Sequence, residues 1–158
     1  MVLKHYEILH HRAGFMGSNL TDRLLADGHT VTGYDNFSTG KNEFTTPALK
    51  SPGIPLVSDD TLDLLAITQA MRCTDYVILL AANADVRLGT GHPKRDLEQN
   101  AIATYNVLET RRTDGIRRIA FSSTGSVYGE ASIIPTLEDA PFPVQTSLYG
   151  LPNWLVRD

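Results

Sequence analysis

Residues 13–35 read AGFMGSNLTDRLLADGHTVTGYD, and the spacing of glycines and apolar residues in this stretch predicts the first local structures. After the opening glycines, leucines recur at helical spacing as far as Gly28, a residue type that commonly ends helices. The apolar run at 30–35 follows at once and is typical of a strand. With the run HYEILH at 5–10 before it, the order is strand, glycine turn, helix, strand.

The rest of the chain continues this alternation of short apolar runs and helical patterns. We expect a loop at 36–55, a short strand at 54–57, a helix at 61–72, strands at 75–82 and 116–124, and the longest helix at 92–115. Alternation of this kind predicts an α/β fold with a Rossmann-like, doubly wound parallel sheet. Nothing in the pattern indicates a repeat or a second domain.

Composition excludes several classes of protein. The chain has 158 residues, a net charge of -4, 42% hydrophobic and 20% charged residues, which is ordinary for a globular protein and gives no reason to expect nucleic acid. A single cysteine, Cys73, cannot form an internal disulfide, and its apolar neighbourhood predicts a buried thiol in a reducing compartment. We find no signal-peptide core or membrane-length apolar run and expect a cytoplasmic protein.

The turn after the first expected strand has the chemistry of a dinucleotide site. Gly14 and Gly17 would let the backbone approach a pyrophosphate at a helix N-terminus, while His11 stands where a first glycine is expected. A side chain there costs roughly a kcal/mol if the backbone is left-handed. Asp35 follows about twenty residues on, where a carboxylate binds ribose hydroxyls and favours NAD over NADP. In the alternative interpretation, the glycines permit helix packing and Asp35 caps a loop.

Histidines near the start of the chain raise the question of a metal site. His10 and His11 are adjacent on an expected strand, so their side chains point to opposite faces, and no acidic or Cys partner is nearby. We therefore predict no metal.

Several dissimilar motifs occur in one order along the chain and carry a family resemblance. They are AGFMGSNLTDRLLADGHTVTGYDNFSTG, DTLDLLAITQAM, LLAANADVR, NAIATYNVLE, AFSSTGSVYG and SLYG. Together they resemble the NAD-dependent epimerase/dehydratase family, the extended short-chain dehydrogenases, and within it are most similar to the UDP-glucose 4-epimerases. The resemblance reaches from the first turn to Gly150.

The resemblance implies an NAD cofactor and assigns groups of residues to its parts. The pyrophosphate would lie against Gly14, Phe15, Met16 and Gly17, and the adenosine ribose would be surrounded by Asp35, Asn36, Ser38 and Gly40. Asp60 and Thr61 would approach the adenine, and Leu80, Ala81 and Ala82 would pass beneath the dinucleotide. Asn100 would hold a strand end near the nicotinamide side, and Ser122 would also contact the cofactor. Tyr149 would contact the cofactor as well as the substrate.

The same resemblance implies a catalytic pair, Thr124 and Tyr149. In the family's 4-epimerases, the Tyr removes a proton from the sugar 4-hydroxyl as hydride passes to the nicotinamide, and the Ser/Thr hydrogen bonds to the same oxygen. The family's Lys four residues after the Tyr, which favours phenolate, is replaced here by Asn153, and Pro152 precedes it. We therefore expect this chain to be inactive by itself.

The tail at 151–158, LPNWLVRD, departs from the family pattern. One back-translation, read in an adjacent frame, gives Ala-Ser-Lys-Leu-Ala-Gly-Ala, which is the family's expected continuation. Our hypothesis is an out-of-frame tail after an NAD-binding Rossmann domain at 1–150, and chance divergence is the alternative.

The resemblance also sets expectations for substrate and partners. The family's substrate-binding half mostly follows this point, so we expect a fold truncated before that half, with a nucleotide sugar as substrate only in the complete family member. A weak homodimer through the helix at 92–115 is expected, without nucleic acid or membrane partners. The alternative function is a stand-alone, non-catalytic dinucleotide-binding or interaction module.

Overall fold

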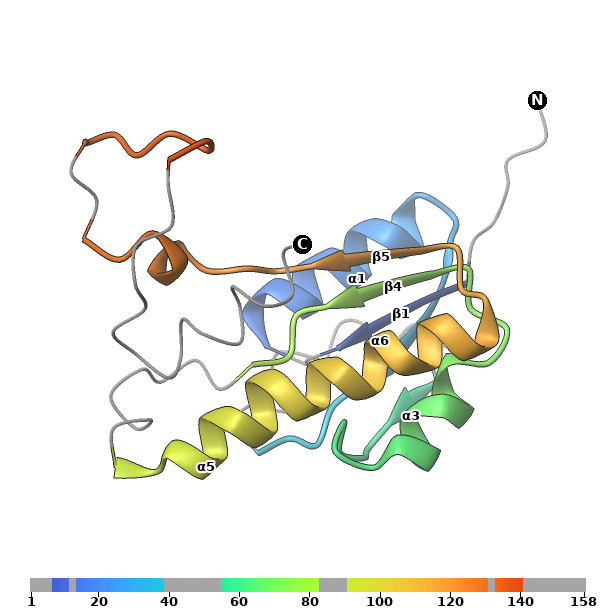
Figure 1. Cartoon of the computed structure of the whole chain (residues 1–158). Helices are drawn as coiled ribbons and strands as arrows, with labels where there is room; N and C mark the ends of the chain where they lie inside the picture. The colour runs from blue at the N-terminus through green and yellow to red at the C-terminus, as the bar shows by residue number, and fades with distance from the viewer. Residues whose placement is uncertain (1–6, 12–13, 39–54, 83–90, 131–132, 141–158) are drawn as a thin grey trace. The chain divides into compact units, whose positions relative to one another are not determined.

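The structure is a computed structural model that describes residues 7–11, 14–38, 55–82, 91–130 and 133–140 (Figure 1). Its elements, in chain order, are β1 Glu7–His11, α1 Phe15–Ala26, β2 Thr30–Tyr34, β3 Leu56–Val57, α3 Leu64–Met71, β4 Tyr76–Leu79, α5 Pro93–Asp96, the π-helical segment η1 Leu97–Ile102, α6 Ala103–Asp114, β5 Arg118–Phe121 and the 3-10 turn η2 Gly125–Tyr128.

The described strands form one parallel sheet in the order β3-β2-β1-β4-β5. The chain moves outward from β1 to β3 and then crosses back to β4 beside β1, so the direction of winding reverses at β1. Because every strand is parallel, the residues that follow the strands meet at one edge of the sheet. Ligands of such sheets bind at this carboxyl edge, near the reversal.

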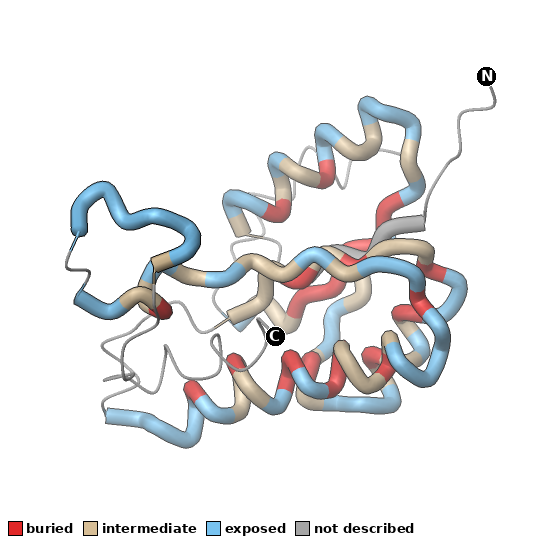
Figure 2. The backbone as a smooth tube through the Cα atoms, turned by 45° about the horizontal axis from the view of Figure 1, so that its top comes forward, coloured by how far each residue is buried: buried red, intermediate tan, exposed pale blue. Residues whose placement is uncertain are grey.

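Helices cover both faces of the sheet, with α1 on one face and α3 and α6 on the other (Figure 1). This arrangement confirms the predicted α/β, Rossmann-like, doubly wound parallel sheet. The main core lies between the sheet and the α3 and α6 face, and Figure 2 shows buried backbone along these elements. Its buried residues are Tyr34, Ile67, Met71, Val77, Leu79, Val107 and Ile116.

The chain divides into two compact units, which are described separately. The first comprises residues 1–81 and 105–122 and contains the sheet. The second comprises residues 82–104 and 123–158, and includes α5, η1 and η2. Within the described ranges, no helix combines the length and the apolar character needed to cross a bilayer.

The predicted helices and strands all have counterparts among the described residues, and several of these are shorter than the sequence pattern indicates. The helix expected at 61–72 begins only at Leu64, because Asp63 caps it: Asp63 Oδ1 accepts hydrogen bonds from the amides of Leu65 at 2.9 Å and Ala66 at 3.0 Å. Residues 60–62 instead form a turn that is held by side chains. Apolar periodicity does not locate such a boundary, whereas the cap does.

The helix expected at 92–115 contains a π-helical segment that the sequence pattern did not predict. Its buried face also differs from the apolar register of the sequence, since Leu97, Ile102 and Tyr105 are exposed. The buried positions of η1 and α6 carry small and polar residues together with Val107: Asn100, Ala103, Thr104, Asn106 and Thr110. Leu97, Ile102 and Tyr105 are therefore surface positions, whereas Val107 is part of the core.

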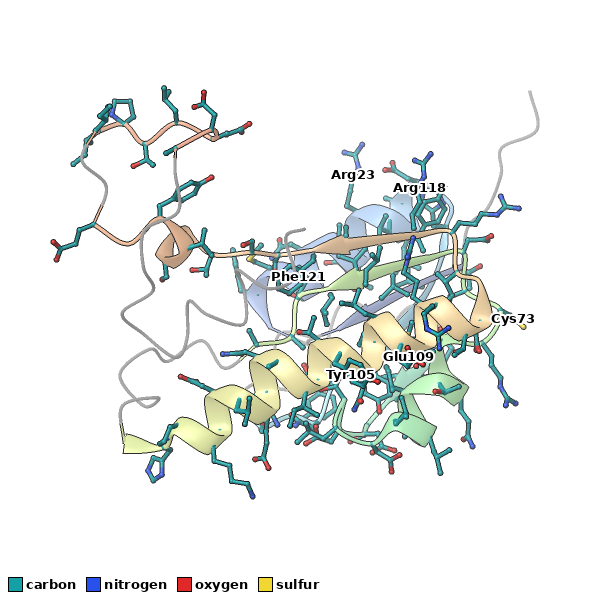
Figure 3. All side chains as sticks on the ribbon, viewed as in Figure 1. Arg23, Cys73, Tyr105, Glu109, Arg118 and Phe121 are labelled. Carbon is teal, nitrogen blue, oxygen red and sulfur yellow. The ribbon has the colours of Figure 1, made fainter. Side chains whose placement is uncertain are left out.

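The prediction of a buried thiol at Cys73 is wrong. Cys73 is exposed and lies between α3 and β4 with a φ of 65°. The surrounding residues are apolar because α3 and β4 enter the core on either side, while the turn itself remains at the surface. Figure 3 shows Cys73 at the end of the sheet opposite Phe121, which ends β5. Cys73 is thus remote from the carboxyl edge.

Candidate functional site

Helix α1 begins at a glycine. Gly14 is the N-cap of α1, with φ -85° and ψ -175°, and has no side chain to hydrogen bond with the first-turn amides. Phe15 and Met16 are 72% and 66% exposed, while Gly17 is buried and its carbonyl accepts a 2.8 Å hydrogen bond from Thr21 Oγ1. A helix N-terminus that begins at a residue without a side chain suits an anionic ligand, because its amides and its dipole favour negative charge.

His11 lies in β1 rather than in the turn. It is the last residue of the strand, in register with Tyr34 of β2 and Leu79 of β4. Its backbone is therefore extended, and the strain expected for a left-handed residue at this position does not arise.

The loop after β2 is organised by two predicted residues, Asp35 and Asn36. Asp35 is buried, and its Oδ1 accepts a 2.6 Å hydrogen bond from the amide of Phe37. Asn36 Oδ1 accepts a 3.0 Å hydrogen bond from the amide of Ser38. Asp35 does cap a loop, as the alternative interpretation held, and it does so at the carboxyl edge where a ribose carboxylate is expected.

The turn after β3 centres on Asp60, which connects several segments. Asp60 Oδ1 accepts a 3.0 Å hydrogen bond from the amide of Leu62, and Oδ2 accepts a 2.9 Å hydrogen bond from Asn36 Nδ2. The Asp60 carbonyl accepts from the amide of Asp63 at 2.9 Å and from Tyr34 Oη at 3.1 Å. The predicted ribose residue Asn36 and the predicted adenine residue Asp60 are therefore joined directly.

Tyr34 and Asn106 belong to this network and were missed at the level of sequence. Asn106 Nδ2, from α6, donates to the carbonyls of Thr61 at 2.9 Å and Leu62 at 3.2 Å. Burial, together with the carboxylates of Asp59, Asp63 and Asp60, raises the pKa of Tyr34 well above its usual value. The signal that could have found Asn106 is its position next to Val107 in the expected helix, where a polar side chain must find a hydrogen-bond partner if it is buried.

The ends of β4 and β5 supply the remaining predicted residues of the first unit. Leu80 and Ala81 are half-buried, and Ala81 packs against the core. Ser122 is tied to β4, because its amide and its Oγ both donate to the Leu79 carbonyl, at 3.1 and 3.3 Å. Leu80, Ala81 and Ser122 therefore add no charged side chain to the carboxyl edge.

The second unit contains Ala82, Asn100 and Thr124. Asn100 is buried in η1, and its carbonyl accepts a 2.7 Å hydrogen bond from Thr104 Oγ1. Thr124 is the N-cap of η2: its Oγ1 accepts from the amide of Ser126 at 3.2 Å and donates to Ser126 Oγ at 3.3 Å. Gly40, Tyr149, Asn153 and the tail at 151–158 lie outside the described residues.

Comparison with known proteins identifies similar chains. A model of the NAD dependent epimerase/dehydratase family matches residues 12–152. UDP-glucose 4-epimerase of Mycolicibacterium smegmatis is 38% identical over 131 residues, which cover 82% of this chain and 42% of that protein. UDP-glucuronic acid decarboxylase 1 of Danio rerio is 35% identical over 127 residues, which cover 80% of this chain and 29% of that protein.

Solved structures show the same similarity. The structure of Thermus thermophilus UDP-glucose 4-epimerase in complex with NAD has a TM-score of 0.82 and 31% identity, over 93% of this chain and 47% of that one. The chain thus spans less than half the length of these similar proteins.

Proposed function

The chain belongs to the NAD-dependent epimerase/dehydratase family, and on that premise we propose that it binds NAD along the carboxyl edge of its sheet. The observation that carries the proposal is the combination of two neighbouring features at this edge. A glycine-capped helix follows β1, and a buried aspartate follows β2. The first suits a pyrophosphate and the second suits the hydroxyls of an adenosine ribose.

The residues of the first unit fit the proposed cofactor. Gly14 has no side chain that would compete for the amides of α1, and Gly17 is buried, which is consistent with close packing at the start of α1. A carboxylate at Asp35 suits ribose hydroxyls and disfavours a 2′-phosphate, so NAD is the preferred dinucleotide. Bound NAD would supply hydride transfer to and from its nicotinamide. Within the first unit, the adenine would lie against Asp60 and Thr61, and Leu80 and Ala81 would pass beneath the dinucleotide.

The finer proposal concerns reaction and substrate. We propose that the chain corresponds to the NAD-binding portion of a nucleotide-sugar epimerase or dehydratase like UDP-glucose 4-epimerase, with Thr124 and Tyr149 as the catalytic pair. Thr124 Oγ1 is oriented by its two contacts with Ser126, which supports a fixed hydroxyl at this position. Asn153 carries no charge to lower the pKa of Tyr149, so we expect no turnover by this chain alone.

A non-catalytic dinucleotide-binding or interaction module is the second candidate function. The observation that favours it is Asn153, since an uncharged residue there cannot replace the family's Lys. Conversion of UDP-glucose by the purified chain would exclude this candidate and would also contradict the expected inactivity.

Titration with dinucleotides tests the proposed function. Isothermal calorimetry with NAD and NADP on the purified chain should show binding of NAD and weaker binding of NADP, because Asp35 disfavours the additional phosphate. The variant Asp35→Asn should reduce the difference in affinity between NAD and NADP. Absence of binding at millimolar NAD would refute the proposed function.

Self-association through the helix at 92–115 is a further part of the proposal. Leu97 and Tyr105, each in its own unit, are 54% and 60% exposed, and exposed apolar side chains support self-association. Sedimentation at increasing protein concentration should reveal a weak dimer, and a monodisperse monomer throughout would contradict it.

A further inference from the structure

We propose that Asn106 and Tyr34 are positioning residues for adenine recognition, because both hold the turn at 60–62 through hydrogen bonds to its backbone carbonyls. This inference rests on the proposed NAD site and adds to it the groups that make the site selective for its base. All of the residues involved belong to the first compact unit.

Asn106 holds the turn from α6. It is buried, and its amide nitrogen reaches two consecutive carbonyls of the turn, those of Thr61 and Leu62, at 2.9 and 3.2 Å. Two neighbouring carbonyls bound by one amide cannot rotate independently. The conformation of the turn is thus fixed by a side chain that lies more than forty positions away in the sequence.

Tyr34 and Asn36 hold the same turn from the β2 side. Tyr34 is 1% exposed and its Oη reaches the Asp60 carbonyl at 3.1 Å, while Asn36 Nδ2 reaches Asp60 Oδ2 at 2.9 Å. Three side chains from β2, its following loop and α6 therefore converge on a turn of three residues. Helix α3 already has its own cap in Asp63, so these three hydrogen-bonding side chains are not needed to start the helix.

The turn presents an acceptor whose direction is fixed. Each oxygen of the Asp60 carboxylate accepts one hydrogen bond within the network, from Leu62 N or Asn36 Nδ2, and a carboxylate oxygen can accept two. A half-buried carboxylate with remaining acceptor capacity suits the 6-amino group of adenine. Hypoxanthine has a carbonyl at that position, which a fixed carboxylate would repel. Rigidity matters here, since a mobile turn could move away from the wrong base.

An ordinary packing role for Asn106 makes a different prediction. If Asn106 only fastens α6 to the sheet, its loss should lower stability without changing which base is preferred. Thr110 provides the matched control, because it is buried one turn further along α6 and its Oγ1 hydrogen bonds with Thr68 Oγ1 of α3 at 3.1 Å, away from the turn.

The experiment compares the affinities of NAD and nicotinamide hypoxanthine dinucleotide for the unsubstituted chain, Asn106→Leu, Tyr34→Phe and Thr110→Val, well below each melting temperature. We expect the preference for NAD to fall about tenfold in Asn106→Leu and about threefold in Tyr34→Phe, as expected when one or two hydrogen bonds that position a ligand group are lost. Thr110→Val should retain the full preference. If Asn106→Leu does not fold, the preference measured in Tyr34→Phe tests the positioning role, and an unchanged preference there overturns it.

The outcomes separate this inference from the proposed function. An unchanged preference in a folded Asn106→Leu, or an equal loss in Thr110→Val, would overturn the positioning role while NAD binding stands. An unsubstituted chain that binds NAD but does not prefer it over the hypoxanthine analogue would likewise overturn it. If the unsubstituted chain binds neither dinucleotide, the proposed function fails and the inference fails with it.

Discussion

Helices α1 and α3 both follow strands of the same sheet, yet their N-termini are built in opposite ways. Helix α1 begins at Gly14, which contributes no side chain to its first-turn amides. Helix α3 begins at Asp63, whose carboxylate accepts hydrogen bonds from Leu65 and Ala66, and the turn before it is held by Tyr34, Asn36 and Asn106. Among the described residues, no side chain caps the start of α1, whereas the start of α3 is capped by Asp63 and anchored by three further side chains.

This difference indicates that the two helix starts at the carboxyl edge suit different parts of a ligand. An N-terminus without a side-chain cap retains its attraction for anions, which suits a pyrophosphate. A capped and anchored turn cannot adapt to a ligand, but it can hold a carboxylate in one place. We infer that the α1 start supplies affinity for the phosphates and the α3 start supplies selectivity for the base.

The largest effect is expected when α1 is given the kind of cap that α3 has. In Gly14→Asp, the extended backbone at φ -85° and ψ -175° accommodates Asp, and its carboxylate should cap the first turn of α1. The dissociation constant for NAD should rise at least about tenfold, because the carboxylate occupies the amides and repels the pyrophosphate. Calorimetry with NAD measures this change.

Stability serves as the internal control for that variant. Gly14→Asp should not lower the free energy of unfolding, and Gly14→Ala, which adds neither a cap nor a charge, should weaken NAD binding less. Unimpaired NAD binding by a folded Gly14→Asp protein would show that the α1 N-terminus is not the phosphate site.

A smaller effect is expected when α3 loses its cap. Asp63→Ala removes the acceptor for two amides and should lower the free energy of unfolding by about 1 kcal/mol. NAD affinity should change little, because the turn at 60–62 keeps its anchors from Tyr34, Asn36 and Asn106. Urea denaturation of Asp63→Ala and of Asp63→Asn, which retains an acceptor, measures the difference. Equal losses of stability in the two variants would contradict the capping role.

The contribution of the Tyr34 hydroxyl to stability is expected to be no larger than that of the Asp63 cap, and it depends on pH. Tyr34→Phe should cost about 1 kcal/mol near neutral pH, the ordinary contribution of a buried hydrogen bond. Burial and nearby carboxylates raise the pKa of Tyr34 in the folded protein above the value of about 10 in the unfolded chain. The folded state therefore keeps the proton longer, and the stability that Tyr34 contributes is fully present below pH 10 and declines above it.

Urea denaturation of both proteins at about pH 8 and about pH 11 tests this sign, since each pH unit above the unfolded pKa is worth about 1.4 kcal/mol. The advantage of the unsubstituted chain over Tyr34→Phe should shrink or disappear at the higher pH. Tyr105→Phe, at a position 60% exposed, provides the control and should show little difference at either pH. If the difference in unfolding free energy between the unsubstituted chain and Tyr34→Phe grew with pH, the raised pKa of Tyr34 would be contradicted.

Much of this fold could be predicted from the sequence, because the elements that build it are marked locally. The alternation of apolar runs and helical patterns gave the parallel α/β sheet, and the two glycines and Asp35 indicated the ends of β1 and β2. The same local reasoning was wrong for Cys73, since apolar neighbours on both sides do not show that the turn between them is exposed. It also missed the π-helical segment, whose extra residue per turn leaves no distinct apolar period.

The sequence by itself determined the family, the order of the elements and the residue types at the carboxyl edge, because these depend on local pattern and on motifs that stand in order along the chain. Only the tertiary structure decided that Asn106 and Tyr34 hold the turn that contains Asp60. The partners Thr61 and Asn106 are far apart in the sequence and meet because the turn before α3 and the part of α6 that carries Asn106 belong to the same compact unit. A contact of that kind has no local pattern, and its hydrogen bonds form only when the sheet and the helix that covers it are in place.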